Sequence, residues 1–252
     1  MSIILKSPRE IEKMRAAGKV AAGTLALAAS LIKPGVTTGE LDAEIEKYIR
    51  SFGGVPTFKG YRNFPASACI SVNEEVVHGI PGPRALKEGD IVTVDVGVTL
   101  DGYIGDTAWT WPVGRISTKA QRLLKATKDA LFLAIEQVRA GRRLSEVSRA
   151  VQNYAESNGY TVVRKFAGHG LGRDLHEEPQ VPNYVDALTR GNDPLMKEGL
   201  VIAIEPMLNV GHYDVTTLKD NWTVVTKDGE LSAHFEHTIA VTANGPDILT
   251  VA

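Results

Sequence analysis

The sequence predicts an α+β fold in which two similar halves each pack helices on an antiparallel-rich β-sheet. Three observations lead to this expectation. Helix-start signals occur in pairs, the runs between them are rich in β-branched residues, and the second half of the chain repeats residues of the first. Because paired helices do not alternate strictly with strands, the order argues against a doubly wound parallel sheet.

The internal repeat is visible at two offsets. A shift of 106 residues lays Gly35 on Gly141, within an ordered series of similar helix residues. A shift of 110 lays LKEGDIVTVD on MKEGLVIAIE, and so places Asp95 on Glu205. A short loop insertion between the two stretches would produce this change of offset.

The repeat predicts a single domain over residues 1–252, with halves of approximately 1–112 and 113–252 related by a pseudo-twofold axis. No Gly/Ser/Pro-rich linker separates the two halves in the sequence. In such a fold, equivalent strand ends from each half meet near the axis. Asp95 and Glu205 are therefore expected to face one another.

Capping boxes, in which a Ser or Thr is followed three residues later by Glu or Gln, predict the helix starts. The predicted starts lie at residues 7–10, 37–40, 118–121 and at Ser145. The first helix has proline at its first position and runs to about Ile32. The second ends at Gly53, a residue type common just after a helix.

The segment IVTVDVGVTLDGYIGDTAWT predicts a β-hairpin that turns on Asp101-Gly102. This turn places Gly97 opposite Asp106. Since alternate residues of a strand share a face, Asp95 and Asp106 become diagonal neighbours, about 7 Å apart at the backbone. Two acids among Ile, Val and Trp are an unusual way to build a core.

The second half supplies two further acids, Glu205 through the repeat and Glu236 just before the apolar strand HTIAVT. Four carboxylates near one axis repel each other, by about 3 kcal/mol for a pair ~6 Å apart at an effective dielectric of 20. Either several of them are protonated or cations lie between them. Two divalent ions would neutralise four carboxylates, so a metal site is favoured.

A nitrogen ligand is available in AGHGLGRDLHEEP, where His169 lies between two glycines that permit close approach of the backbone, and His176 follows. The loop matches neither the helical HExxH metal motif nor the GxGxxG dinucleotide motif. An isolated histidine is more often a satisfied structural residue, and on the residues alone that alternative stays open. His78, in the loop VNEEVVHGIPGPR, is a weaker candidate, and His212, His234 and His237 are not assigned as ligands.

Composition excludes several classes of protein. The 28 Lys+Arg balance 30 Asp+Glu for a net charge of -2, without a dense basic run, so direct binding of nucleic acid or an anionic membrane is not implied. The single cysteine, Cys69, excludes an internal disulfide and suits a reducing compartment. The start lacks a signal-peptide core, and the apolar stretch at 21–32 is too short to span a bilayer. A cytoplasmic protein is expected.

With these motifs in view, the chain resembles the type I methionine aminopeptidases of the pita-bread fold along nearly its whole length. The resemblance is carried by SPREIEKMRAAG, ACISVNEEVVHGIPG, IVTVDVG, GYIGDTAWT, AGHGLGRDLHEEP, VIAIEPM and KDNWTVVTKDGELSAHFEHTIAVT. The ordered set Asp95, Asp106, His169, Glu205 and Glu236 matches the five metal ligands of that family. The resemblance implies that Asp106 and Glu236 bridge two ions, that Asp95 holds one, and that His169 and Glu205 hold the other.

The resemblance also implies the substrate contacts. His176 would contact the substrate carbonyl or scissile amide, and His78 would lie near the amide nitrogen. The methionine side chain would lie in an apolar pocket formed by Tyr61, Phe64, Cys69 and Trp222. Leu175 departs from the aromatic residue often found beside the second histidine, so the shape of the pocket is open, and Cys69 could equally be core.

The implied activity is removal of the N-terminal methionine from nascent proteins and peptides. Two divalent metal ions (Co, Mn, Fe or Zn) would activate a bridging water and polarise the peptide carbonyl. Glu205 would accept the proton of that water and pass it towards the leaving amine. The implied partner is a peptide or nascent-chain terminus bearing Met, with possible association to the ribosome, and a monomer is expected.

Two alternatives remain. An Xaa-Pro peptidase or creatinase relative shares the fold, but such enzymes typically carry a large extra amino-terminal domain, whereas the first predicted helix begins by Pro8. A non-catalytic pita-bread binding module should have lost metal ligands, and all five are present.

Overall fold

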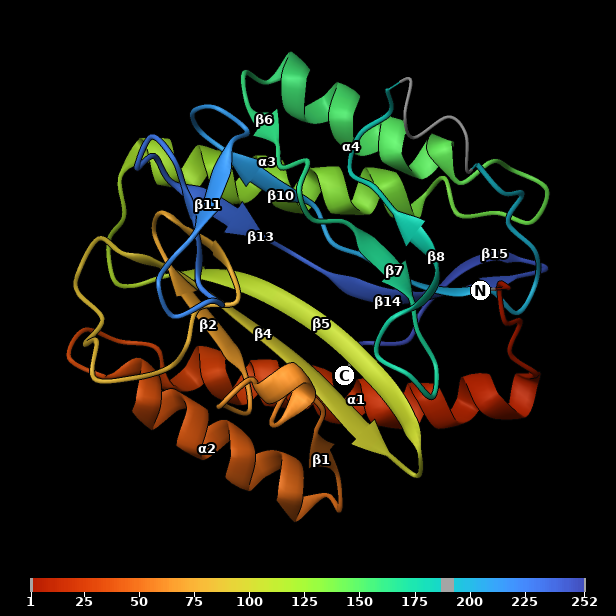
Figure 1. The fold of residues 1–252 in the computed structure, drawn as a ribbon, viewed down its shortest axis with the longest axis horizontal. Helices are drawn as coiled ribbons and strands as arrows, with labels where there is room; N and C mark the ends of the chain where they lie inside the picture. The colour runs from red at the N-terminus through yellow and green to blue at the C-terminus, as the bar shows by residue number, and fades with distance from the viewer. Residues whose placement is uncertain (1, 187–192, 252) are drawn as a thin grey trace.

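The computed structural model describes residues 2–186 and 193–251, so the ends of the predicted domain, residues 1 and 252, lie outside the described residues. Two helices followed by a group of strands occur twice along the chain (Figure 1). The helices are α1 (Pro8–Leu31), α2 (Thr38–Ser51), α3 (Thr118–Ile135) and α4 (Ser145–Ser157). A short 3₁₀ turn, η1, spans Tyr61–Asn63. This mixed arrangement confirms the predicted α+β class.

The strands of the first group are β1 (Val55–Pro56), β2 (Cys69–Val72), β3 (Glu75–Val77), β4 (Ile91–Leu100) and β5 (Tyr103–Pro112). Those between α4 and residue 209 are β6 (Thr161–Val162), β7 (Gly168–Gly170), β8 (Glu177–Val181), β9 (Val201–Ile204) and β10 (Met207–Asn209). The last are β11 (Val215–Thr217), β12 (Val224–Thr226), β13 (Ser232–His234), β14 (His237–Thr242) and β15 (Gly245–Ile248).

The first two helices begin at the predicted capping boxes. The Ser7 side chain accepts from the backbone N–H of Glu10, and the Glu10 carboxylate accepts from the backbone N–H of Ser7 at 2.9 Å. Thr37 and Glu40 make the same reciprocal pair at the start of α2. Each box satisfies two N–H groups that the helix itself leaves without partners.

The caps of the second pair of helices differ from the prediction. The side chain of Ser117, and not that of Thr118, accepts from the N–H of Ala120, so the cap of α3 lies one residue earlier. Ser145 is the first residue of α4, and its Oγ donates to Asp193 at 2.8 Å instead of capping the helix. Serine and threonine can both cap, and a distant carboxylate competes for Ser145, so local sequence did not determine either position.

The hairpin of β4 and β5 has the predicted register. Asp101 and Gly102 both have positive φ angles, 49° and 75°, as a two-residue primed turn requires. Gly97 lies opposite Asp106, as predicted, and Asp95 lies opposite Ala108. The acids therefore share the predicted face of the sheet.

Antiparallel pairing builds all the described sheets. One sheet has the order β1-β4-β2 with β5 paired to β4, and a five-stranded sheet has the order β15-β14-β9-β7-β8. Two three-stranded sheets have the orders β13-β10-β6 and β11-β12-β3. The repeated KEG turns precede β4 and β9 alike, with Gly89 and Gly199 at φ angles of 95° and 85°.

A seam joins the amino-terminal half (residues 2–112) to the carboxy-terminal half (113–251). Glu236 and Ala108 form an antiparallel bridge, in which the Glu236 N–H donates to the Ala108 carbonyl at 2.8 Å. Beside this bridge, the Thr107 hydroxyl donates to the Glu236 carbonyl at 2.7 Å. The seam thus fixes Asp106, one residue away on β5, relative to Glu236.

Each half supplies most of one apolar cluster, and a third cluster, which includes Met14 and Leu171, is built from both halves. Residues such as Leu41 and Ile45 of α2 pack with Val94 of β4 in the cluster of the first half, and Leu131 of α3 packs with Ile202 of β9 in that of the second. Helices α1 and α2 lie along one edge of the molecule in Figure 1 and α3 and α4 along the opposite edge, with the strands between them. In the described ranges no helix is both long and apolar enough to cross a membrane. With one helix pair along each edge, the strands lie at the centre of the molecule.

Candidate metal centre

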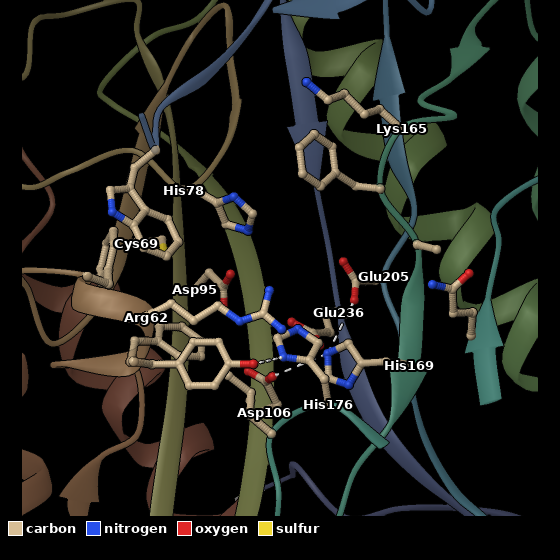
Figure 2. A pocket seen from close by; sticks show the side chains of 18 of the residues that line it. Arg62, Cys69, His78, Asp95, Asp106, Lys165, His169, His176, Glu205 and Glu236 are labelled. Atoms are coloured by element: carbon tan, nitrogen blue, oxygen red, sulfur yellow. Dashed lines mark hydrogen bonds and ion pairs between the residues drawn. The ribbon is translucent and has the colours of Figure 1, made fainter. Parts of the chain in front are cut away.

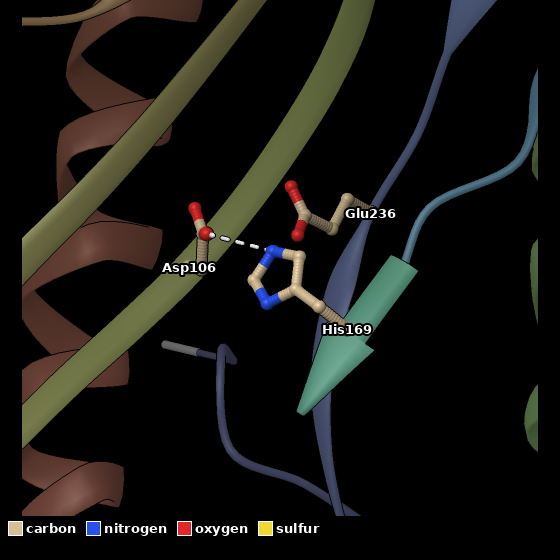
Figure 3. Close-up of side chains that lie close together, drawn as sticks. All are labelled: Asp106, His169 and Glu236. Atoms are coloured by element: carbon tan, nitrogen blue, oxygen red, sulfur yellow. Dashed lines mark ion pairs between the residues drawn. The ribbon is translucent and has the colours of Figure 1, made fainter. Parts of the chain in front are cut away.

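Three of the predicted ligands meet at the seam. Asp106 comes from β5, His169 from β7, and Glu236 from the connection between β13 and β14. One ligand atom from each residue lies within 4.8 Å of the others, and the residues are only 3%, 7% and 2% exposed. Figure 3 shows the His169 ring pointing at the two carboxylates. The group combines both halves of the chain.

Asp95 and Glu205 complete the set, and Figure 2 shows them above this group in the same cavity. Asp95 lies in the middle of β4, whereas Glu205 directly follows β9. Glu205 Oε1 lies 3.6 Å from His169 Nε2, and Asp106 Oδ2 lies 3.8 Å from the same nitrogen. The structure therefore brings all five predicted ligands together.

Proline at position 206 explains why an apolar strand ends on a carboxylate. It has no N–H group and cannot continue the ladder, so the chain leaves the sheet immediately after Glu205. The Asn183 side chain donates to the Glu205 carbonyl at 3.0 Å and so holds the backbone at this point. The carboxylate is thereby presented into the cavity.

The carboxylates are incompletely satisfied by the protein. Among the described residues, Asp95 Oδ1 and Asp106 Oδ1 are buried without a hydrogen-bond partner. Burial raises the pKa of Asp106 to about 7, and burial together with the neighbouring carboxylates raises the pKa of Asp95, Glu205 and Glu236 well above the usual range. A buried carboxylate that lacks partners is stabilised by a cation, so the site fits divalent metal.

His169 has the tautomer that a metal ligand needs. Its Nδ1 lies 2.9 Å from the Gly170 carbonyl and donates to it, which leaves the Nε2 lone pair directed at Asp106 and Glu205. Burial, with a smaller contribution from His176, lowers the pKa of His169 to about 3, so the ring is neutral. A lone pair facing two carboxylate oxygens favours a proton or a cation between them. The donor set, rich in oxygen with one imidazole, suits a divalent metal ion.

A cavity of about 530 Å³ opens above the carboxylates. It is lined by every residue predicted to contact the substrate, namely Tyr61, Phe64, Cys69, His78, His176 and Trp222. Phe64 and Trp222 meet edge to face with ring centroids 5.0 Å apart. Leu175 also lines the cavity and is 6% exposed, so an aliphatic side chain occupies the position that the resemblance associates with an aromatic ring.

Cys69 fits both of the alternatives considered for it. It lines the cavity and also belongs to a buried apolar cluster with Phe64 and Leu175. Burial, and then the nearby Asp95, raises the pKa of the thiol well above its ordinary value. Cys69 is therefore an unreactive apolar surface of the cavity.

The two predicted substrate-contacting histidines lie on different walls of this cavity. His78 follows β3 with a φ of 61°, and its ring packs edge-on against Phe166 at 5.3 Å. Burial lowers the pKa of His78 to about 4. The His176 ring lies 4.3 Å from that of His169, and its Nδ1 is 2.8 Å from the Tyr61 hydroxyl. Both histidines can therefore reach a molecule bound beside the carboxylates.

Three cationic side chains of the cavity were missed in the sequence. Arg62, Arg164 and Lys165 all line it. Arg164 lies over the Tyr213 ring at 4.1 Å, and Arg62 adopts a φ of 47° inside η1. The Arg-Lys pair just before AGHG was a possible signal, but local sequence does not reveal that this segment turns towards the cavity.

The remaining histidines, His212, His234 and His237, are not among the residues that line the cavity. His212 is exposed, whereas His234 and His237 are buried. His237 Nδ1 lies 2.8 Å from the Thr250 hydroxyl, on the opposite side of the strand from Glu236. Among the described residues, both ring nitrogens of His234 lack a hydrogen-bond partner.

Comparison with known proteins places this geometry in context. Residues 12–243 match the model of the metallopeptidase family M24. The chain is 52% identical to methionine aminopeptidase 1 of Bacillus subtilis over 248 residues, which cover 98% of this chain and 99% of that protein. It is 46% identical to the methionine aminopeptidase of Escherichia coli K12 over 253 residues, 100% of this chain and 95% of that protein.

Solved structures give the same picture. The crystal structure of methionine aminopeptidase from Rickettsia prowazekii matches with a TM-score of 0.96 and 44% identity over 99% of this chain and 100% of that one. A prolidase from Pyrococcus furiosus, at 23% identity, matches with a TM-score of 0.80 over 99% of this chain and 66% of that one, and shares the fold. These matches confirm the predicted pita-bread fold.

Proposed function

The chain belongs to metallopeptidase family M24 and, within it, to the type I methionine aminopeptidases. We propose that its residues remove an N-terminal methionine in the following way. The observation that carries the proposal is the convergence of four carboxylates and one neutral imidazole at the floor of a cavity of about 530 Å³. The donors come from both halves of the chain.

Two divalent cations are the proposed cofactor, since two such charges balance four carboxylates. Asp106 and Glu236, at the seam, would help to hold both ions, Asp95 would hold one of them, and His169 with Glu205 would hold the other. When bound, such ions lower the pKa of a water held between them and polarise the peptide carbonyl. Which of Co, Mn, Fe or Zn is used is left to experiment.

Glu205 is proposed to move the proton. Its backbone is fixed between the end of β9 and Pro206, so its carboxylate faces the cavity next to His169 Nε2 at 3.6 Å. The carboxylate would accept a proton from the attacking water and deliver it to the leaving amine. The burial that raises its pKa makes this carboxylate a stronger proton acceptor than an exposed glutamate.

His176 and His78 are proposed to hold the substrate backbone. The Tyr61 hydroxyl donates to His176 Nδ1 in the tautomer that leaves an N–H on Nε2, and that N–H can donate to the substrate carbonyl. Burial, and then the nearby Arg62, lowers the pKa of His176, which favours the neutral ring. His78, held by the rings of Phe166 and Trp222, would contact the substrate amide nitrogen.

The methionine side chain is proposed to lie among the apolar residues of the cavity, which are Tyr61, Phe64, Cys69, Leu175 and Trp222. An unbranched thioether fits an irregular aromatic pocket and makes favourable sulfur–aromatic contacts. The edge-to-face pair of Phe64 and Trp222 supplies two such rings. Because the carboxylates lie at the cavity floor, a free α-amino group beside them would restrict cleavage to the first residue.

The decisive experiment compares substrates and metals together. Protein purified without oxygen is stripped with EDTA, reloaded separately with Mn, Fe, Co or Zn, and assayed with Met-Ala-Ser and with an Xaa-Pro dipeptide. We expect release of methionine from the tripeptide, to unequal extents with the four metals, and little hydrolysis of the dipeptide. Preference for the Xaa-Pro bond would overturn the proposal.

The cellular context is proposed from the substrate and from the cysteine content of the chain. The expected partner is a nascent chain or peptide bearing Met. A monomeric enzyme would bind it in the cytoplasm or at the ribosome. The single cysteine suits a reducing compartment. Sedimentation of the purified protein with and without ribosomes tests the monomer and the association together.

A further inference from the structure

The loop that carries His176 is held by the amino-terminal segment of the chain, far away in sequence. It connects β7 to β8 and consists of residues 171–176, directly before Glu177 (Figure 1). Lys6, which precedes α1, forms an ion pair through its Nζ with Glu177 Oε2. This contact joins residues 171 positions apart and lies directly beside His176.

The pair is buried, unlike comparable pairs in this chain. The side chains of Lys6 and Glu177 are 5% and 7% exposed. In the other lysine–carboxylate pairs of the described residues, the lysine side chain is at least 44% exposed. Burial of two charges is costly unless further hydrogen bonds fix their geometry. Such a pair therefore holds the two segments that carry it in a defined position.

Both partners have those further hydrogen bonds. Lys6 Nζ also donates to the Ile4 carbonyl at 3.0 Å, and the Lys6 backbone N–H donates to Gly199, in the turn before β9. Glu177 Oε1 accepts from the backbone N–H of Arg173 at 3.1 Å and more weakly from that of Asp174 at 3.4 Å. The Glu177 carboxylate therefore ties the start of the loop to its end and ties both to Lys6.

A glycine makes room for the pair. A Cβ on Gly172 would collide with Lys6 Cε and lie 2.6 Å from Glu177 Oε1. The same glycine accepts from the N–H of Ile104 at 2.9 Å, which fixes the loop to β5. Any side chain at position 172 would therefore displace the pair.

A second contact from the first turn of α1 holds the same loop. Arg173 donates to the Tyr103 hydroxyl at 2.8 Å, and its guanidinium lies 4.6 Å from the Tyr103 ring centre. The Tyr103 hydroxyl in turn donates to Glu10 Oε1 at 2.9 Å. The loop is thus held on both sides of His176, at Glu177 by Lys6 and at Arg173 by Tyr103, which is itself bonded to Glu10.

We propose that Lys6, acting through Glu177, is a positioning residue that sets the orientation of the His176 ring in the cavity. The ring contacts Tyr61, whose hydroxyl lies 2.8 Å from Nδ1, and the backbone next to it is held by the Lys6–Glu177 pair. The inference rests on the proposed function, in which His176 contacts the substrate. Displacement of a catalytic group by about 1 Å can cost a factor of 100 in rate.

The kinetic test uses Lys6→Met, Glu177→Gln and the double variant, each loaded with Mn²⁺ and assayed with Met-Ala-Ser. We expect each single variant to lose about tenfold or more in kcat, with Mn²⁺ affinity within about twofold of the unaltered chain. The double variant should lose no more than a single one, because the two residues act as a unit. Lys119→Met, which breaks the exposed pair with Glu230, is the matched control and should leave kcat unchanged.

The double variant also covers the case in which a single variant fails to fold, because it leaves no unpaired buried charge. A folded Lys6→Met protein with kcat within about twofold of the unaltered chain would overturn the proposal, and so would losses in the double variant that multiply. Loss of metal along with activity would equally count against it, since it would show general damage to the site.

A spectroscopic readout separates this inference from the proposed function. In Zn²⁺-loaded protein labelled with ¹⁵N at histidine, Lys6→Met should shift the ring resonances of His176, whose Nδ1 contacts Tyr61, and leave those of exposed His212 in place. An unchanged His176 signal would overturn the positioning role even in an active enzyme. Failure of the unaltered chain to release methionine would instead end the proposed function, and the histidine spectrum would still decide whether Lys6 orients His176.

Discussion

Thr238 and Asp106 hold each other's backbone across the seam between the two halves. The Thr238 hydroxyl donates to the Asp106 carbonyl at 2.7 Å and accepts from the Asp106 N–H at 3.1 Å. Both residues are buried. One hydroxyl of the carboxy-terminal half therefore satisfies the whole backbone of a proposed ligand in the amino-terminal half.

Replacement of Thr238 by Val, which keeps the shape, should remove both hydrogen bonds. We expect a loss of about 2 kcal/mol in the free energy of unfolding, because a buried N–H and carbonyl lose their partner. Urea denaturation of the metal-free protein measures this change. Thr216→Val, at an exposed position of β11, should have no comparable effect. Equal stability of the two variants would contradict the importance of this contact.

Asp106→Asn should remove metal and activity together. An amide at this position can no longer share a cation with His169 and Glu236, so metal affinity should fall by roughly a hundredfold or more. Calorimetric titration with Mn²⁺ and the release of methionine measure the two effects. Asp101→Asn, in the turn of the same hairpin, keeps a residue that tolerates positive φ and should bind metal normally. Normal metal binding by Asp106→Asn would remove the bridging assignment.

Metal affinity should rise with pH through about 7. Burial raises the pKa of Asp106 to about 7 in the metal-free protein, and the pKa of Glu236 lies well above its usual range, so incoming metal displaces protons. Titration with Mn²⁺ in buffers of different ionisation enthalpy counts the protons released. Constant affinity between pH 6.5 and 8, without proton release, would show that the carboxylates are already ionised.

The same pKa shifts predict how the metal-free protein responds to pH. A carboxyl whose folded pKa is raised contributes stability that is complete below its unfolded pKa of about 4 and is lost as pH rises through the folded value. For Asp106 that loss extends to about pH 7. The rise in melting temperature on adding metal should therefore be larger at pH 8 than at pH 6.5. A smaller rise at pH 8 would contradict the assignment.

His78→Ala should separate binding of metal from turnover. His78 lines the cavity between Phe166 and Trp222, outside the group formed by the five proposed ligands. Metal content should be unchanged while kcat falls by about a hundredfold, since the contact to the substrate amide nitrogen is lost. Elemental analysis and steady-state kinetics measure the two quantities. His212→Ala at the exposed histidine is the control, and loss of metal from His78→Ala would mean that His78 is a ligand.

Trp222→Ala should widen the methionine pocket. Trp222 is partly exposed and faces Phe64 edge-on, so truncation opens the cavity with limited damage to the core. We expect KM for Met-Ala-Ser to rise by about tenfold, with improved relative cleavage of peptides that begin with a larger apolar residue. Phe52→Ala, at a ring that is 55% exposed, should change neither value. An unaltered KM would place the methionine side chain elsewhere.

The hairpin and the acids could be predicted because their cause is local. A two-residue Asp-Gly turn fixes the register of β4 and β5, and the period of two then places Asp95 and Asp106 on one face. The repeat extended this reasoning to Glu205. These inferences need only neighbouring residues and one symmetry.

Contacts that cross the chain could not be read in the same way. The cap of α3 moved by one residue because Ser117 and Thr118 offer the same chemistry, and Ser145 was taken by Asp193, a partner 48 residues away. Arg62 was missed as a cavity residue because nothing in the amino-acid composition predicts its positive φ. Tertiary competition decides such positions, and sequence pattern records it weakly.

The seam couples metal binding to the association of the two halves. Asp95 and Asp106 belong to the first half, whereas His169, Glu205 and Glu236 belong to the second, and all five face one cavity. A cation bound by residues of both halves would cross-link them, and its removal would leave carboxylates that repel each other once the pH exceeds the Asp106 pKa of about 7. When metal is scarce, the two halves of such an enzyme would separate more easily. Metal depletion would therefore reduce the stability of the fold as well as the activity.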